Sequence, residues 1–316
     1  MILRDMPPIW EPAFRAGFYA RWGHENCIIA ARTRAADYPP YRQTLSIKAA
    51  WGGREDYYVD SRRVGVDDDT FLILNEGRTY GSSLRSATPV TSFSIFFRPG
   101  MARDVVRTLL TPQERLLENP DPGTAAVDFA EHVHRHDRSI TPVLGLIRSQ
   151  VQAGEQDEGL YEEQLYFLMR RMMTLRDRDR RATQSIRAVR ASTRRELYRR
   201  VGLALDYINT QFAQPIGLTQ IAAAARLSPY HCLRVFKSVC RQSPAEHLRD
   251  KRLRVACRLL KNPSLSVELV AAMAGFQNRT TLFRNMKRSA GIAPARLRRQ
   301  WEEETPLEMR KIRPDR

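Results

Sequence analysis

An internal repeat in the last third of the chain constrains its fold more than any other feature of the sequence. The residue pairs that share an offset of 50 are Arg234 with Arg284, Phe236 with Met286, Lys237 with Lys287, and Pro244 with Pro294. Ala222 and Ala271 pair at an offset of 49, so the second copy holds one additional residue near its turn. The apolar spacing over residues 199–299 is helical throughout. This repeat predicts two packed copies of one unit, a helix–turn–helix followed by a further helix.

The first copy, residues 218–244, joins an apolar helix to a second helix that begins at a strong start signal. Ser228 and Pro229 form that signal, because serine accepts hydrogen bonds from free backbone N–H groups and proline fits the first helical position. The second helix is expected over residues 229–240, with a buried face of Cys232, Val235, Phe236 and Val239. Its opposite face is predicted to carry Tyr230, Leu233, Arg234 and Lys237. An apolar back and a basic, aromatic front are what a helix that recognises DNA bases needs.

The second copy, residues 266–294, has the same order of features. Gly275 can take the positive φ angle that its turn requires, and the second helix is expected over residues 278–289. The outward side chains of this helix are predicted to be Arg279, Thr280, Thr281, Phe283 and Arg284, with Lys287 and Arg288 near its end. Between the copies, Ser243 and Glu246 form a capping box that opens a helix ending at Leu260. This helix of about 16 residues, about 24 Å long, could hold the two recognition helices roughly 34 Å apart, one turn of DNA.

The positive charge of the chain is concentrated in the repeat. The whole sequence has a formal net charge of +17. Residues 199–300 contain 19 basic and 4 acidic residues, a net charge of +15. A basic domain beside a nearly neutral one is typical of proteins that bind nucleic acid. The other explanation is a solvated basic surface that keeps the protein soluble.

The first hundred residues have the pattern of a β domain. Short β-branched and aromatic runs recur at residues 27–32, 44–51, 56–60, 70–74 and 91–97, and turn-forming residues separate them. Such spacing predicts a small barrel or sandwich. Helices are expected next, over residues 101–117, 125–136, 140–152 and 160–175, followed by an exposed connector over 176–195. We therefore expect an α+β protein with domains over 1–155, 156–198 and 199–300 and a tail over 301–316.

Enzymatic and metal-binding signals are weak in this sequence. His132, His134 and His136 would share one face of a strand, but the surrounding residues favour a helix and a loop, so surface or capping histidines are expected and no metal site is assigned. The four cysteines lack a CxxC spacing, and no GxSxG elbow or Gly-rich phosphate loop is present. An enzyme is therefore not expected. No apolar run approaches the roughly 18 residues of a membrane span, and no secretion signal precedes the first domain, so a cytoplasmic protein is expected.

Residues 216–298 resemble the DNA-binding domain of the arabinose-operon regulator (AraC) family of bacterial transcription factors. The residues that carry the resemblance include Leu218, Ile221, Ala222, Leu227, Ser228, Pro229, Arg234, Phe236, Lys237, Ser243, Pro244, Arg252, Ala256, Ala271, Gly275, Phe276, Lys287, Gly291, Pro294 and Arg298. The chain departs from the family pattern at Arg226 and Arg241, where a small residue or glycine is usual, and at Leu282 and Met286, where aromatic residues are usual. The first half is similar to the cupin-like sensor half of some members, which implies a cupin-like β-barrel with flanking helices.

The resemblance implies a sequence-specific transcriptional regulator that binds double-stranded DNA. Residues implied in DNA contact are Ser228, Tyr230, Leu233, Arg234, Lys237, Arg279, Thr280, Thr281, Arg284 and Lys287. It also implies a small-molecule effector or a dimer surface in the barrel, a homodimer with helix 160–175 as a dimerisation element, a contact with RNA polymerase, and no cofactor. The alternatives are an architectural protein that binds DNA without choosing sequence, and an enzyme in the barrel fused to a DNA anchor.

Overall fold

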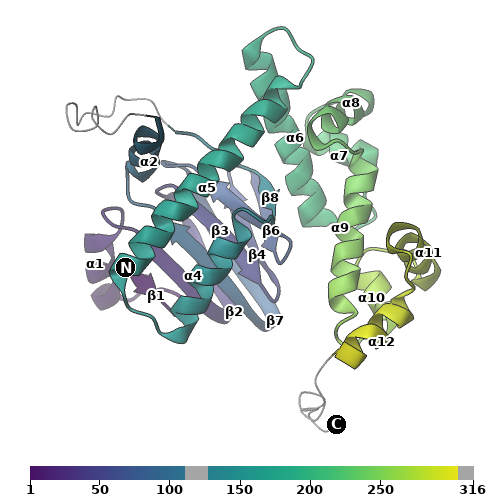
Figure 1. Cartoon of the computed structure of the whole chain (residues 1–316), viewed down its shortest axis with the longest axis horizontal. Coiled ribbons are helices and arrows are strands. Elements are labelled where there is room, and N and C mark those ends of the chain that lie inside the picture. Colours follow the sequence, from purple (N-terminus) through teal and green to yellow (C-terminus); the bar gives the residue numbers. More distant parts are fainter. Residues whose placement is uncertain (111–126, 305–316) are drawn as a thin grey trace. The chain divides into compact units, whose positions relative to one another are not determined.

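The computed structural model describes residues 1–110 and 127–304 (Figure 1). Two compact units divide the chain, Met1–Asp206 and the residues from Tyr207 onward. The boundary between them falls inside a single helix, α6 (Ala191–Gln211). Among the described residues, no helix is both long enough and apolar enough to cross a membrane.

The first unit is built on one mixed sheet. Its strands are β1 (Ile2–Leu3), β2 (Cys27–Arg42), β3 (Ser46–Trp51), β4 (Arg54–Val59), β5 (Arg62–Asp67), β6 (Thr70–Leu74), β7 (Thr79–Phe96) and β8 (Val133–Arg135). The main path runs β1-β2-β7-β3-β6-β8, and β4 pairs with β7 and β5. The long β7 pairs with β2 on one side, and on the other with β4 along its first half and β3 along its second.

This sheet is open, so the predicted cupin-like barrel is not confirmed. Among the described strands, β8 pairs with β6 alone and β1 with β2 alone, and no ladder joins these two ends of the sheet. The expected α+β composition is observed. Short strand runs are typical of both barrels and open sheets, and closure depends on pairing between strands far apart in the chain.

Helices cover one face of the sheet. They are α2 (Met101–Leu110), α4 (Thr141–Ala153) and α5 (Glu158–Gln184), while α1 (Pro12–Arg21) lies near the N-terminus. Alternate side chains of β3 point to opposite faces of the sheet. Ile47 joins the core shared with α4 and α5, and Lys48 points to the other face. The helix expected over 101–117 begins at Met101, and its last part lies outside the described residues.

One prediction for this unit is wrong. The helix expected over residues 125–136 is absent from 127–136, where β8 forms instead. The apolar stripe of the helix expected over 160–175 is buried within the unit, because Leu165, Leu168 and Met172 of α5 pack in the same core as the sheet, so a dimer contact through this helix would use its other face. The helix also runs to Gln184, through half of the expected connector.

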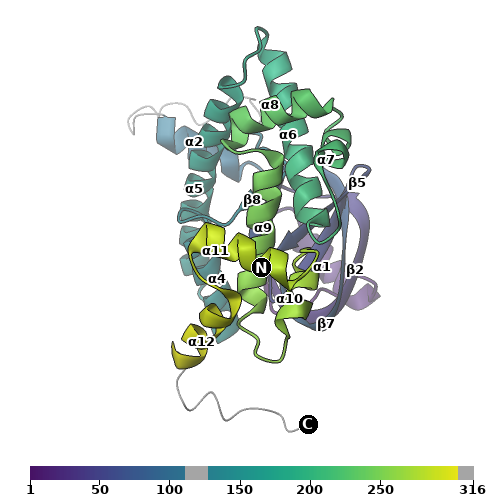
Figure 2. The same ribbon diagram turned by 90° about the vertical axis from the view of Figure 1, so that its right-hand side faces the viewer.

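The second unit is helical and follows the repeat. Its helices are α7 (Leu218–Ala224), α8 (Pro229–Cys240), α9 (Pro244–Leu259), α10 (Val267–Met273), α11 (Arg279–Ala290) and α12 (Pro294–Glu304). The pair α7–α8 lies at one end of α9 and the pair α10–α11 at the other (Figures 1 and 2). The predicted capping box opens α9: Ser243 Oγ accepts from the backbone N–H of Glu246, and the Glu246 carboxylate accepts from that of Ser243.

The two copies differ at their tightest backbone positions. Arg226 and Arg241 adopt φ angles of 55° and 60°, and Gly275 and Gly291 occupy the corresponding positions of the second copy with 80° and 67°. In each copy, the residue that follows the first of these left-handed positions donates its backbone N–H to a carbonyl of the preceding helix. Leu227 N–H donates to the carbonyl oxygen of Ala222, and Phe276 N–H donates to that of Ala271. The two departures from the family pattern thus coincide with the left-handed positions of the first copy.

Candidate nucleic-acid interface

Helix α8 buries one face and exposes the other, as predicted. Cys232, Val235 and Phe236 are buried. Tyr230 is 76% exposed and Leu233 37% exposed, and Arg234 and Lys237 are exposed beside them. Ser228 lies at the N-cap, where its hydroxyl accepts from the backbone N–H of His231 at 3.4 Å. The front of α8 is therefore a solvated surface with two cations and two apolar side chains.

Helix α11 has the same division in the second copy. Leu282 and Met286, the departures from the usual aromatics, are buried, so both serve as core residues. Arg284 and Lys287 are exposed, and Thr280 is exposed in the first turn. The exposed front of α11 is more basic than that of α8 because Arg288 is also on the surface.

Two of the predicted contact residues of α11 have partners within the chain. Arg279 forms an exposed ion pair with Glu268 of α10, with 3.1 Å between Nη1 and Oε1. Thr281 is half-buried, and its hydroxyl donates to the Asn278 side chain at 3.0 Å. Asn278 itself caps α11 by accepting from the Thr281 backbone N–H. Sequence reasoning missed this capping role, although Asn278 stands 50 residues after the N-cap Ser228.

Two half-buried arginines fix the ends of the unit. Arg252 of α9 donates to the carbonyls of Phe212 and Gln214, each at 2.7 Å. Arg298 of α12 donates to the carbonyl of Leu265 at 2.8 Å. Such bonds satisfy carbonyls at chain turns that no helix pairs. Both arginines carry the family resemblance, and their contacts show a structural role.

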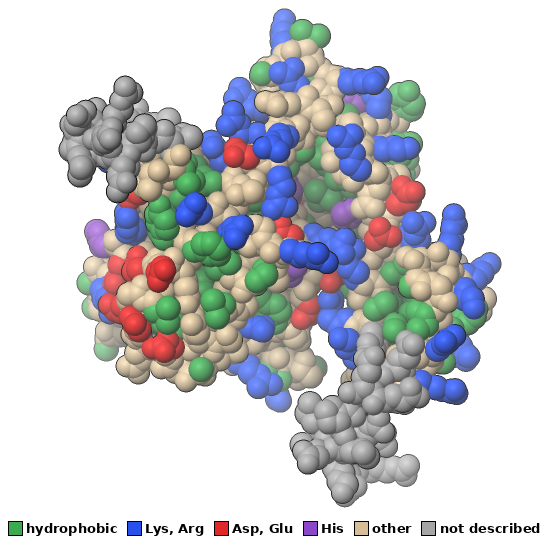
Figure 3. Space-filling model, viewed as in Figure 1, with side chains coloured by type: hydrophobic (Ala, Val, Ile, Leu, Met, Phe, Trp, Pro, Cys, Tyr) green, Lys and Arg blue, Asp and Glu red, His purple; other side chains and the backbone are tan. Residues whose placement is uncertain are grey.

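The electrostatic character of the second unit agrees with its sequence. On the face shown in Figure 3, Lys and Arg side chains are spread over this unit and few acidic ones lie among them. Helices α8 and α11 present their cations to solvent, except for Arg279, which pairs with Glu268. A surface of this kind attracts a polyanion.

A cavity that is partly open to solvent lies in the first unit, on the face of the sheet to which Lys48 points. Its wall includes Lys48, Glu55, Tyr57 and Gln43. Lys48 and Glu55 are both buried, and Lys48 Nζ lies 3.4 Å from the centre of the Phe96 ring. Burial lowers the pKa of Lys48 and raises that of Glu55. A cavity with buried ionisable groups is a common form of small-molecule site.

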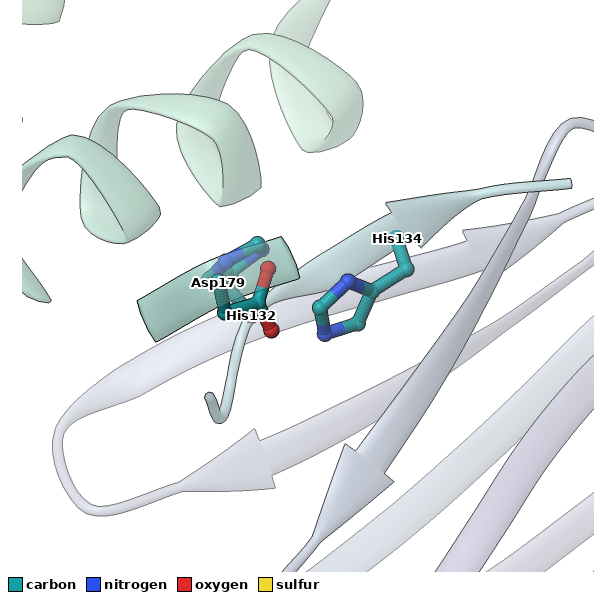
Figure 4. Close-up of side chains that lie close together, drawn as sticks. All are labelled: His132, His134 and Asp179. Carbon is teal, nitrogen blue, oxygen red and sulfur yellow. The ribbon is translucent and has the colours of Figure 1, made fainter. Parts of the chain in front are cut away.

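A second group of polar side chains lies where β8 meets α5. One potential ligand atom from each of His132, His134 and Asp179 lies within 4.8 Å of the others (Figure 4). Both histidines are buried, so the expectation of surface histidines is wrong for this pair. Burial lowers the pKa of His132, and its neighbour His134 lowers it further. His136 lies apart from them, with its Nδ1 3.0 Å from the Thr141 hydroxyl.

Comparison with known proteins finds its matches in the repeat. The helix-turn-helix domain family matches residues 221–300. The HTH-type transcriptional regulator YdeC of Bacillus subtilis is 27% identical over 28% of this chain and 31% of its own length. The bifunctional transcriptional activator and DNA repair enzyme AdaA of the same organism is 28% identical over 31% of this chain and 46% of its own. The multiple antibiotic resistance protein MarA of Escherichia coli is 24% identical over 30% of this chain and 74% of its own.

The chain thus spans less than half the length of YdeC and AdaA. Among solved structures, the DNA-binding domain of the transcriptional factor AdpA in complex with a target DNA is 25% identical, with a TM-score of 0.33 over 34% of this chain and 96% of that domain. The unsaturated fatty acid-bound ToxT of Vibrio cholerae is 9% identical, with a TM-score of 0.33 over 87% of this chain and 95% of its own.

Proposed function

We propose that the protein is a sequence-specific DNA-binding transcriptional regulator of the AraC type, with residues 221–300, which match the helix-turn-helix domain family, as its DNA-binding part. The observation that carries the proposal is the pair of capped helices, α8 and α11, each with a buried apolar back and an exposed basic front. They stand at the two ends of α9, a helix of 16 residues. This arrangement suits two readers of successive major-groove segments.

The exposed side chains have distinct roles in this proposal. Arg234 and Arg284 each pair with a guanine edge, a contact worth about 1–3 kcal/mol of discrimination. Lys237 and Lys287 contact phosphates, which position the protein without specifying sequence. Tyr230, Leu233 and Thr280 supply further contacts to base edges. Ser228, Arg279 and Thr281 hold the starts of the recognition helices near the phosphate backbone, in keeping with their capping and ion-pair contacts.

The first unit senses an effector in the cavity beside Lys48. The wall of this cavity combines buried ionisable and hydroxyl groups, Lys48, Glu55 and Tyr57 among them, with the aromatic ring of Phe96. A small molecule with both polar and apolar groups would pair with the former and pack against the latter. Its binding would raise the unfolding midpoint of the full chain and alter its affinity for DNA. The regulator acts as a homodimer, in contact with RNA polymerase.

Selection of binding sites from random DNA tests the proposal. The full-length protein should recover, at near-physiological salt and with excess competitor, a motif with two contact blocks about 10 base pairs apart. A repeat of that motif would indicate a dimer. Tight binding at low salt with no motif would instead support the architectural alternative, whose affinity depends on charge alone.

Substitution of one arginine and one lysine on the same helix separates base contacts from phosphate contacts. Arg284→Ala should weaken binding to the selected site about 5- to 150-fold, the equivalent of 1–3 kcal/mol, and should weaken non-specific binding much less. Lys287→Ala, the matched control, should weaken both to a similar degree and reduce the salt dependence by about one unit of slope. Equal losses for Arg284→Ala on both kinds of DNA would show a phosphate contact only.

A further inference from the structure

The hydrogen bonds of His132 and His134 determine which ring nitrogen of each carries the proton. His132 Nδ1 lies 2.9 Å from the carbonyl oxygen of Val133, and His134 Nε2 lies 3.0 Å from that of Ala130. A carbonyl oxygen only accepts, so each of these nitrogens carries the proton. The second nitrogen of each neutral ring keeps a lone pair. Metal-binding histidines show this pattern, in which the other ring N–H donates to a carbonyl or carboxylate and fixes the ring.

The third side chain is oriented by a neighbouring helix. Asp179 belongs to α5, and its Oδ1 accepts from the Tyr198 hydroxyl of α6 at 2.7 Å. Its carboxylate lies beside the two imidazole rings in Figure 4. Asp179 is half-buried, whereas both histidines are buried. The group is therefore enclosed on the histidine side and accessible to water on the carboxylate side.

The spacing of the three ligand atoms suits a small transition-metal ion after a modest movement. Atoms within 4.8 Å of one another surround a centre that is at most about 2.8 Å from each. Zinc lies about 2.0–2.1 Å from imidazole nitrogen and about 2.0–2.2 Å from carboxylate oxygen, so each ligand would move inward by about 0.7 Å or less. Side-chain rotation supplies that distance. Imidazole ligands favour zinc, cobalt, nickel or copper over magnesium and calcium, which prefer oxygen.

We propose that His132, His134 and Asp179 bind one divalent transition-metal ion of the zinc class, with water at the remaining position. The ion would join β8 to α5, two elements that are distant in sequence. Helix α6 packs directly over this site: a Cβ atom added at Gly202 would come within 3.0 Å of the His132 ring, and Tyr198 contacts that ring edge-on at 5.9 Å between centroids. The bound ion would therefore brace the helix that continues into the second unit.

Direct measurement of metal binding tests this site apart from any DNA-binding function. The full chain, purified without an affinity tag and stripped with a chelator, is titrated with Zn²⁺ by calorimetry and with Co²⁺ by visible absorption. We expect one ion per chain, the absorption of a four-coordinate cobalt centre, and a higher unfolding midpoint with Zn²⁺ than without it.

Three variants separate this site from adventitious binding. His134→Ala and Asp179→Asn should each weaken Zn²⁺ binding by tenfold or more and abolish the cobalt spectrum. Asp179→Asn keeps an oxygen that can accept from Tyr198, so it keeps the local fold if His134→Ala does not. His24→Ala removes an exposed histidine outside the group and should leave both readouts unchanged. No binding by the intact chain, or binding that all three variants retain, would overturn the proposal.

Discussion

Gly275, in the turn between α10 and α11, should tolerate substitution less well than the other glycines of the second unit. Gly275 has a φ of 80°, and a Cβ atom added there would lie 2.5 Å from the Phe212 carbonyl oxygen and 2.8 Å from the Cα of Ala213. Both are backbone atoms, so the clash cannot be relieved by turning a side chain. The same carbonyl accepts a hydrogen bond from Arg252 at 2.7 Å. A methyl group at this position would therefore disturb the attachment of α9 to the start of the unit.

Gly291 provides a matched control. It has a φ of 67°, but an added Cβ atom would meet no other atom within 4 Å. Gly291→Ala should therefore cost only the left-handed strain, about 1–2 kcal/mol. Gly275→Ala should cost that strain plus about 1–3 kcal/mol for the overlap and about 1.5–3 kcal/mol if the Arg252 bond is lost. We expect Gly275→Ala to be the more destabilising by at least about 1 kcal/mol, and by at least about 2.5 kcal/mol if the Arg252 bond is lost.

Urea-induced unfolding of the full chain measures both variants, and hydrogen exchange of peptides from α9 to α11 assigns the loss to the second unit. We expect a large fall in the urea midpoint and in exchange protection for Gly275→Ala and a small fall for Gly291→Ala. Equal losses would contradict this expectation, because they would show that backbone strain alone matters and that the close approach to Phe212 does not.

Two further predictions concern the ends of α8 and α9. Arg241→Gly should stabilise the second unit by up to about 1 kcal/mol, because glycine takes the φ of 60° without strain; a lower urea midpoint would contradict this. The hydrogen bonds from Ser243, the backbone N–H first, lower the pKa of Glu246 below its ordinary 4.5. The stability this carboxylate contributes is thus complete above about pH 4.5 and declines as the pH falls below it. Glu246→Gln should flatten the dependence of the urea midpoint on pH in that acidic range, and an unchanged pH profile would rule out the capping contribution.

Helices α8 and α11 are the part of the candidate site that local sequence predicted well. Serine followed by proline starts α8 at Pro229, as expected, and the apolar spacing identified Cys232, Val235 and Phe236 as its buried face. The start of α11 was expected one residue early, because Asn278 is the cap rather than the first helical residue. These features depend on contacts within four residues, which the order of residues specifies directly.

The first unit shows where such reasoning fails. The histidine run was assigned to a helix, yet residues 133–135 pair with Thr70, Phe71 and Leu72 of β6. A three-residue edge strand has too few residues to show a two-residue period, so its partner decides its conformation. The packing partner of α5 was likewise not predictable from local sequence: its apolar stripe completes the core of the sheet.

The sequence by itself determined the repeat, the caps at Ser228 and Ser243, the turn at Gly275 and the basic front of helices α8 and α11, since each is set by neighbours along the chain. Only the tertiary structure decided that the sheet stays open, that a cavity forms around Lys48 and Glu55, and that Asp179 meets His132 and His134. The physical reason is that each of these features joins segments that are far apart along the chain. Only the packing of whole strands and helices brings such segments together.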